Sequence, residues 1–404
     1  MSLLVFLGNI VARALGFLFP IIVARAATRS DFATVYFFIA TGFFVSELVL
    51  TGYPTALTRS LAAETVPAAH GSWFSSALLG GAPLLAVSLL MGGIFSAVVD
   101  ESPVFMSFVV IGLTIDAYYF SLLRGLQLFK WLVSYRIGAN VGQLLLVLAT
   151  VGLHEATVPV LVTVYSFVYL VPIVIIELVA RPLRTLVSSA ARPTRSRVRD
   201  LTRFAIPSLI SGTAYAAIFG LDVFYVRLLA PAALPDYAAA RSLTVPLILL
   251  PFSVGTVLMP RVAGATDAER RLLLKRSVIG TAVVGVAGVA AYVLLSSALV
   301  GLVFPSGYAA AATIASYLAP AIGVLAVYST LSQWWLGVGR PVAAATSIGI
   351  GALGAGAAQL ALTPAHGAAG AAAAVTIGIG TSLVVLAWQT VRLLRAPVSR
   401  TAPE

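Results

Sequence analysis

The sequence predicts an all-α membrane protein with about 12 transmembrane helices in two six-helix lobes. Three observations predict this class: 60% of the 404 residues are hydrophobic, only 10% are charged, and the mean hydropathy is +1.02. Because soluble domains carry about 25% charged residues, this chain lacks the polar groups that would cover a surface in water. We therefore expect an integral membrane protein.

Apolar segments of about 20 residues recur along the whole chain, and each is long enough to cross a bilayer as a helix. They are too long, and alternate too little, for transmembrane β-strands. Boundaries are least defined in 309–391, where Ala and Gly dominate. The predicted spans are 3–25, 34–58, 73–99, 103–123, 132–153, 157–180, 203–227, 237–260, 277–304, 309–336, 341–363 and 367–391.

The basic residues fall on one side of this topology. When alternate loops are assigned to opposite sides, 20 of the 25 Lys and Arg residues share one side. The other side holds only Arg25, Arg29 and Arg227, while Arg13 and Arg241 lie within spans. Cytoplasmic loops of membrane proteins are enriched in Lys and Arg. We therefore expect a multi-pass protein of the cell membrane with both termini in the cytoplasm.

Two basic segments lie between spans. The longer one, RPLRTLVSSAARPTRSRVRD at 181–200, holds six Arg and one Asp near the middle of the chain. It predicts a basic cytoplasmic linker (181–203) between lobes at 1–180 and 204–404; the alternative is a regulatory site. The other, TDAERRLLLKR at 266–276, begins with a capping-box pattern and predicts a short helix in the membrane interface.

The two lobes show weak internal similarity. DFATVYFFI at Asp31 is similar to DYAAARSLT at Asp236, an offset of 205, and Ile137-Gly138 matches Ile348-Gly349 at an offset of 211. Six spans in each half make both halves enter the membrane from the same side. The halves are then parallel repeats related by an axis along the membrane normal, a geometry suited to alternating access.

Polar residues at membrane depth lie on helical stripes. In the first span Asn9 and Arg13 share a face with Gly16 and Pro20. Glu47 in the second span lies at the same depth as Arg13, about 18–20 Å from the outer end at 1.5 Å per residue. An Arg13–Glu47 pair is therefore feasible, either as a structural lock or as part of the function.

Three further spans hold charges. Asp116 is central in the fourth span and has no obvious cationic partner in its own hairpin. It is therefore protonated, paired across the bundle or part of a proton or cation relay. Asp222 in the seventh span lies at a level that Arg241 in the eighth can reach, as a partly solvated structural pair or a functional one, and Tyr215 shares the side of Asp222.

Several function classes lack their motifs. The chain has no Cys, no Gly-Lys phosphate loop, and three His without metal-ligand spacing. We therefore expect no cofactor, no metal and no nucleic acid partner, and a protein that is not an enzyme. A membrane-embedded glycan-assembly enzyme stays open as an alternative, with Asp100-Glu101 as its best acidic candidate. No repeated filter loop of a channel is present.

Three segments resemble a known family: 124–148, 203–212 with 236–263, and 13–62, which reads RALGFLFPIIVARAATRSDFATVYFFIATGFFVSELVLTGYPTALTRSLA. They resemble polysaccharide transporters, the O-antigen and exopolysaccharide flippase branch of the multidrug/oligosaccharidyl-lipid/polysaccharide flippase superfamily. The chain departs from the family at Ala33, where Gly is usual, and in having twelve predicted spans where many relatives have fourteen. In 13–62 the matching residues are Arg13, Gly16, Ala24-Arg25, Asp31-Phe32, Gly52, Pro54, Arg59 and Ala62.

The resemblance implies an alternating-access flippase that moves a polyprenyl-pyrophosphate-linked oligosaccharide, or a similar glycolipid, for cell-surface polysaccharide synthesis. Implied partners are this substrate, the bilayer, H+ or Na+, and glycan-assembly proteins. A cation-coupled multidrug or metabolite exporter of the same superfamily is the alternative. The expected substrate contacts are Arg13, Arg25, Arg241, Asn9 and Tyr215, and the expected coupling-ion or counter-ion groups are Glu47, Asp116 and Asp222.

Overall fold

Regular structure is helical throughout the described part of the computed structural model, which confirms the predicted class. The structure describes residues 2–183, 186, 192–244, 247, 258–259, 261–262 and 264–395. The side chains of residues 2–7, 9, 10, 13, 67 and 68 are outside this description. Two candidate site residues of the first span, Asn9 and Arg13, are therefore placed by their backbone only.

The first half of the chain contains six predicted spans, and four of its helices, α3, α4, α5 and α7, have Pro in their first two positions, where its missing N–H costs nothing. Gly52 separates α2 from α3, and Pro54 follows directly inside α3. The helices are α1 (Ser2–Ala26), α2 (Arg29–Leu50), α3 (Tyr53–Ala63), α4 (Pro67–Val98), α5 (Pro103–Gly125), α6 (Phe129–Gly152), α7 (Val158–Phe167) and α8 (Leu170–Val179).

The second half follows the same pattern, with two short 3-10 helices at its turns. Gly367 has φ 56° and ψ −134°, which is not helical, so α16 consists of two helices at 341–366 and 368–395. The elements are α10 (Arg195–Phe219), α11 (Leu221–Leu229), η1 (Pro231–Ala233), α12 (Leu234–Thr244), α14 (Asp267–Val303), η3 (Ser306–Tyr308), α15 (Ala311–Gly337) and α16 (Pro341–Arg395).

Within the described residues, nine helices are long and apolar enough to cross a membrane. One of these, Pro341–Arg395, contains two predicted spans, and α1 supplies the first span. The predicted eighth span, 237–260, begins within α12 and continues outside the described residues. The chain is thus a multi-pass membrane protein.

Two boundaries differ from the sequence prediction. Helix α10 begins at Arg195, so the second part of the predicted linker 181–203 is helical. The basic segment 266–276 is not a separate interfacial helix, because no Gly or Pro interrupts it and α14 continues from Asp267 to Val303. Its capping box is present: Glu269 Oε2 accepts the Thr266 N–H at 2.8 Å. The bonds from Thr266 lower the pKa of the Glu269 carboxyl.

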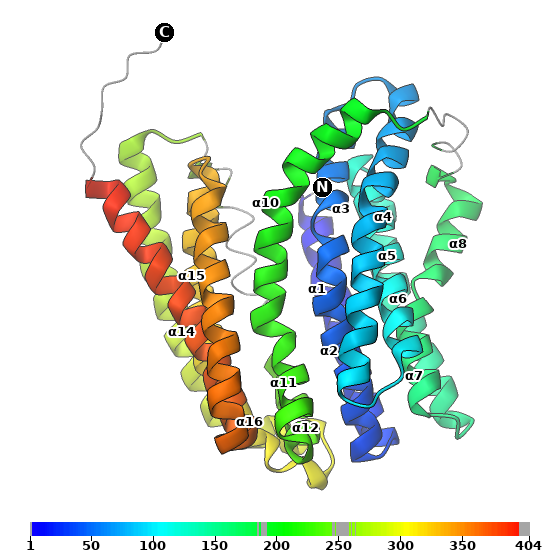
Figure 1. Ribbon diagram of the computed structural model, residues 1–404, viewed down its shortest axis with the longest axis vertical. Coiled ribbons are helices and arrows are strands. Elements are labelled where there is room, and N and C mark those ends of the chain that lie inside the picture. The colour runs from blue at the N-terminus through cyan, green and yellow to red at the C-terminus, as the bar shows by residue number, and fades with distance from the viewer. Residues whose placement is uncertain are drawn as a thin grey trace.

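The helices form two groups that diverge at one end and converge at the other (Figure 1). We call the diverging end, which holds residues 192–194, 264–266 and the end of α16, the linker end. The opposite end holds the α1–α2 turn, η1 and η3, and we call it the far end. Helix α10 lies between the groups, with its first turns over α3 and α4 and its last turns beside α16.

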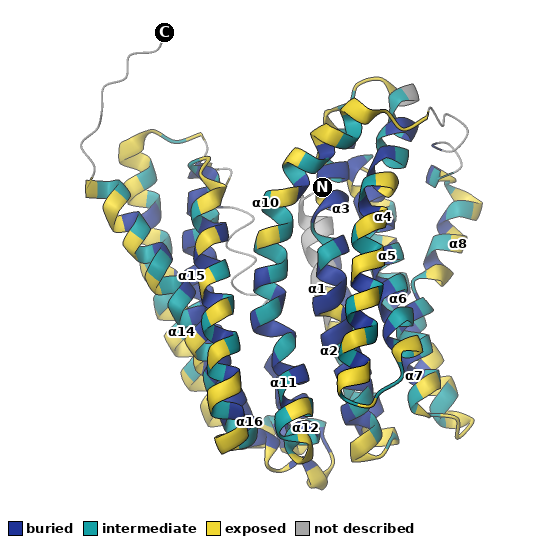
Figure 2. Cartoon of the chain, viewed as in Figure 1, coloured by how far each residue is buried: buried dark blue, intermediate teal, exposed yellow. Residues whose placement is uncertain are grey.

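Burial follows this arrangement. One core cluster contains residues of both halves, including Phe32, Phe38, Tyr237 and Tyr308. The outer faces of α14, α8 and α16 are exposed (Figure 2). They carry apolar residues, and Leu294, at 82%, is the most exposed large apolar residue of those that the structure describes. Apolar side chains on an outer face are stable in hydrocarbon, so these faces fit contact with lipid.

Candidate functional site

A glycine break between α10 and α11 positions the buried acid of the second half. Gly220 has φ −135° and ψ −37°, and a Cβ there would lie 2.8 Å from the Ala216 carbonyl oxygen and 3.1 Å from Phe44 Cβ. Only Gly allows this close approach to α2. Because α11 restarts at Leu221, Asp222 lies in its first turn, where the helix dipole favours a carboxylate.

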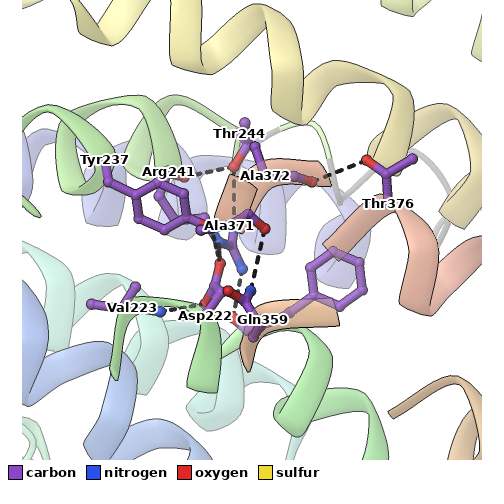
Figure 3. Close-up of polar contacts among 10 residues, drawn as sticks. Asp222, Val223, Tyr237, Arg241, Thr244, Gln359, Ala371, Ala372 and Thr376 are labelled. Carbon is purple, nitrogen blue, oxygen red and sulfur yellow. Dashed lines mark hydrogen bonds and ion pairs between the residues drawn. The ribbon is translucent and has the colours of Figure 1, made fainter. Parts of the chain in front are cut away.

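Asp222 and Arg241 form a buried ion pair (Figure 3). Asp222 Oδ2 accepts Arg241 Nε at 2.9 Å and the Tyr237 hydroxyl at 2.8 Å, and Oδ1 accepts the Val223 N–H at 3.0 Å. The residues are 1% and 5% exposed. The pairing expected from their depths is present, but the pair is buried rather than partly solvated.

All three nitrogens of the Arg241 guanidinium donate hydrogen bonds within the protein. Nη2 donates to the Phe219 carbonyl at 2.6 Å, and Nη1 donates to Thr244 Oγ1 at 3.1 Å. A desolvated ion pair is tolerated when its remaining donors and acceptors are also bonded. Tyr215, half-buried on α10, stacks on Phe219 at 5.0 Å between ring centroids, which places it beside this network.

The amide side chain of Gln359, on α16, lies next to this network. Gln359 Nε2 donates to the Ala371 carbonyl at 3.2 Å (Figure 3). Gln359 Oε1 accepts the Thr363 hydroxyl at 2.6 Å. The Gln359–Ala371 bond crosses the turn at Gly367 and joins the two helices of α16, whereas the Thr363–Gln359 bond lies within the first of them. The sequence interpretation did not single out Gln359.

The first half has a related network with a different exposure. Asp116 on α5 accepts the Tyr135 hydroxyl at 2.7 Å and Arg136 Nη1 at 3.1 Å, both from α6. The Arg136 guanidinium also lies 4.2 Å from the Phe120 ring. The Arg136 side chain is 30% exposed, against 6% for Arg241, so it is the more accessible of the two cations.

This pair corrects the expectation that Asp116 lacks a cationic partner in its own hairpin. Asp116 lies nine residues before the end of α5 at Gly125, and Arg136 seven residues after the start of α6 at Phe129. The two therefore have similar depth, and this similarity in the sequence would have identified Arg136 as the partner.

Glu47 is the third buried carboxyl and has a different environment. It is 5% exposed, and none of the described cations forms an ion pair with it. A Cβ on Gly212 of α10 would lie 2.7 Å from Glu47 Oε1 and 2.5 Å from Thr51 Oγ1. The carboxyl therefore packs against bare α10 backbone, between the two halves. The predicted pair with Arg13 falls on a side chain outside the described residues.

Arg25 and Arg29 join the halves at the far end. Arg25 donates to the last carbonyls of α14, from Nη2 to Leu302 at 2.6 Å and from Nε to Val303 at 2.9 Å. Arg29 Nη2 lies 2.8 Å from Asp236 Oδ2. Arg25, an expected substrate contact, caps a helix C-terminus of the other half in this structure.

Further contacts close the same end. Phe32 packs edge-on against Tyr308 at 5.6 Å, and Phe95 against Phe224 at 4.5 Å between ring centroids. Arg227 forms an ion pair with Glu101 from the other half. Burial raises the pKa of the Glu101 carboxyl, and the Arg227 guanidinium partly offsets this rise. The far end is thus bonded across the halves by charges and aromatic rings.

Comparison with known proteins identifies the family. A family model described as Polysaccharide biosynthesis protein matches residues 2–265, which is more than half of the chain. The chain belongs to this family. No curated protein sequence matches it.

Solved structures share the fold at low sequence identity. The chain matches a structure described as the lipid II flippase MurJ in an inward closed conformation, with a TM-score of 0.71, 14% identity and coverage of 96% of this chain and 87% of that one. It also matches an inward-facing multidrug resistance MATE family transporter of the MOP superfamily, with a TM-score of 0.69, 14% identity and 94% of each chain covered. A eukaryotic MATE transporter matches with a TM-score of 0.61, 17% identity, and 96% and 93% covered. These likenesses establish the fold.

Proposed function

We propose that the protein is a flippase that moves a polyprenyl-pyrophosphate-linked oligosaccharide, or a similar glycolipid, from the cytoplasmic to the outer leaflet by alternating access. The main support is membership of the Polysaccharide biosynthesis protein family, on a fold shared with a protein described as a lipid II flippase. The positive-inside rule assigns the linker end to the cytoplasm of the cell membrane.

The polar contacts at the far end support the alternating-access part of this proposal. Arg25, Arg29 and Arg227 bond the two halves there, while the helix groups diverge at the linker end (Figure 1). In the transport cycle these contacts break as the far end opens, and the substrate stabilises one arrangement more than the other.

Arg136 is the proposed membrane-depth contact for the pyrophosphate. Its side chain is partly exposed, and a single charge-assisted bond at 3.1 Å holds it to Asp116. A planar guanidinium suits phosphate oxygens, which it binds with two parallel bonds. Arg13 remains a second proposed contact for the pyrophosphate, because it also carries a guanidinium. Arg241 contributes only if its bonds to Asp222 and Phe219 rearrange.

Glu47 is the proposed site for H+ or Na+. Its carboxyl is buried, lies between the halves, and has no described cation to balance its charge. A proton or a sodium ion would balance that charge. The same observation favours the second candidate function, a cation-coupled exporter of small amphiphiles.

Flipping in proteoliposomes tests the proposal, with a fluorescent polyprenyl-pyrophosphate oligosaccharide and a membrane-impermeant quencher. We expect Arg136→Gln to slow the initial rate about tenfold or more, the loss of one charge-assisted contact, and Arg136→Lys to slow it less. Arg124→Gln, an exposed Arg at the end of α5, is the matched control and keeps the rate.

Wild-type rates from a well-folded Arg136→Gln protein would refute the contact. No flipping by the wild type, together with proton- or sodium-driven efflux of a cationic amphiphile, would replace the flippase by the exporter.

A further inference from the structure

A groove lies between α14 and α15. Its volume is about 340 Å³, and almost all of its lining is apolar. The two helices approach closely where a Cβ on Gly285 would lie 3.4 Å from the Gly323 carbonyl oxygen. On either side of this crossing, Gly280 and Gly288 have no neighbouring atom within 4 Å of a Cβ position. Absent side chains therefore make the groove.

The mouth of the groove at the linker end is basic. Arg276 lines it, and Arg271 and Lys275 are exposed in the preceding turn of α14. An apolar groove with cations at its mouth is complementary to a lipid that joins a hydrocarbon chain to a phosphate.

The groove is longer than one leaflet. It extends along α14 from Arg276 to Tyr292, about 24 Å at 1.5 Å per residue. The hydrocarbon core of a bilayer is about 30 Å thick, so one leaflet supplies about 15 Å. A chain that begins with its phosphate at Arg276 and follows the whole groove therefore passes the bilayer midplane, which suits a polyprenyl chain longer than one leaflet.

We propose that this groove holds the polyprenyl chain of the substrate, with the phosphate at Arg276. This assignment rests on the proposed function and names the lipid part of its substrate. Tyr292 closes the inner end; it is 5% exposed, and its hydroxyl has no hydrogen-bond partner in the described part of the chain. A hydrocarbon chain gives that hydroxyl no partner either, so Tyr292→Phe removes no bond.

Photo-crosslinking tests the groove without requiring transport. The probe is a long-chain polyprenyl monophosphate with a diazirine near the end of its chain, added to the purified protein in nanodiscs. We expect labelled peptides from α14 and α15. Gly280→Leu and Gly288→Leu place a large side chain in the groove from Cβ positions that have no atom within 4 Å, and they are expected to reduce labelling about tenfold or more. Gly301→Leu is the matched control, because Gly301 is exposed on the same helix, has the same free space and lies outside the groove.

Three comparisons identify the ligand. Arg276→Gln is expected to weaken labelling by the phosphate probe and not by uncharged polyprenol. Tyr292→Phe is expected to keep labelling; its loss would show a polar group at the inner end and overturn the chain assignment. Equal labelling by a diazirine phosphatidylglycerol that polyprenyl phosphate does not displace would assign the groove to bulk lipid instead.

Unchanged labelling in the well-folded Gly280→Leu and Gly288→Leu proteins would also overturn the proposal. The readouts separate its failure from failure of the proposed function. A labelled groove in a protein that does not flip the glycolipid refutes the flippase alone. Wild-type flipping by both groove-filling variants refutes the groove alone.

Discussion

Asp222→Asn tests whether the buried pair of the second half stabilises the fold. The substitution keeps the shape of the side chain and removes the charge, which leaves the Arg241 guanidinium, 5% exposed, without a counter-ion. Removing one partner of a buried ion pair costs about 3–5 kcal/mol. Asn keeps an oxygen that can accept one or two of the three bonds that Asp222 accepts, so we expect the lower end, about 3 kcal/mol. This corresponds to roughly a hundredfold change in the unfolding equilibrium.

The assay is reversible unfolding in mixed micelles, titrated with a denaturing detergent and followed by Trp fluorescence. Asp100→Asn is the matched control, because Asp100 is exposed in a turn with φ 59°, which Asn also adopts. We expect it to change the free energy of unfolding by less than about 0.5 kcal/mol. In the double variant Asp222→Asn/Arg241→Met, we expect a loss about 1–3 kcal/mol smaller than the sum of the single losses. A loss below about 1 kcal/mol for Asp222→Asn, or additive losses, would refute the reasoning that this pair is desolvated and coupled.

Three further predictions follow from other contacts. Gly212→Ala places a Cβ within 2.7 Å of the Glu47 side chain and is expected to destabilise the protein by about 1–3 kcal/mol in the same assay. Its control, Gly349→Ala, places a Cβ with no atom within 4 Å and is expected to be neutral or to stabilise by up to about 1 kcal/mol. Equal effects of the two substitutions would contradict the packing of Gly212 against Glu47. The chain has no Cys, so the thiol of an Ala311→Cys variant, at a position 0% exposed at the far end, can be labelled selectively. Arg29→Gln breaks the ion pair across the halves and is expected to speed that labelling. An unchanged labelling rate would show that the ion pair does not hold the far end closed. The pKa of Glu269 is lowered, so the stabilisation from its cap is fully present above about pH 4.3 and is lost as the pH falls through the folded-state pKa. Glu269→Gln should therefore reduce the difference between the thermal midpoints at neutral and at acidic pH. An unchanged difference would show that the carboxylate does not stabilise the cap.

The sequence predicted most of the helices because burial in lipid requires long apolar segments with internally bonded backbone. It predicted the break between the last two spans only to within a few residues, since many small residues there permit a turn and only the φ of Gly367 fixes it. It did not predict that α10 begins at Arg195, within the predicted linker, since charge asymmetry reports the side of the membrane and not the backbone conformation.

The candidate site was predictable where two groups share a hairpin or adjacent helices. Depth alone brought Asp222 and Arg241 together, and would have brought Asp116 to Arg136. The surroundings of Glu47 were not predictable, because its neighbour Gly212 is 165 residues away and no local pattern encodes which helices of the two halves meet. The groove on α14 was also hidden, because helical periodicity does not show which partner lies opposite Gly280 and Gly288.

Arg25 has a consequence for the secondary structure of the opposite half. Its guanidinium supplies two donors to Leu302 and Val303, carbonyls in the last turn of α14 that a helix cannot satisfy by itself. When the far end opens, those donors leave and water has to replace them. Opening should therefore fray the end of α14, and faster amide hydrogen exchange around Phe304, which donates to the Val300 carbonyl at 2.8 Å, would report it. The length of one helix would then depend on the conformational state of the transporter.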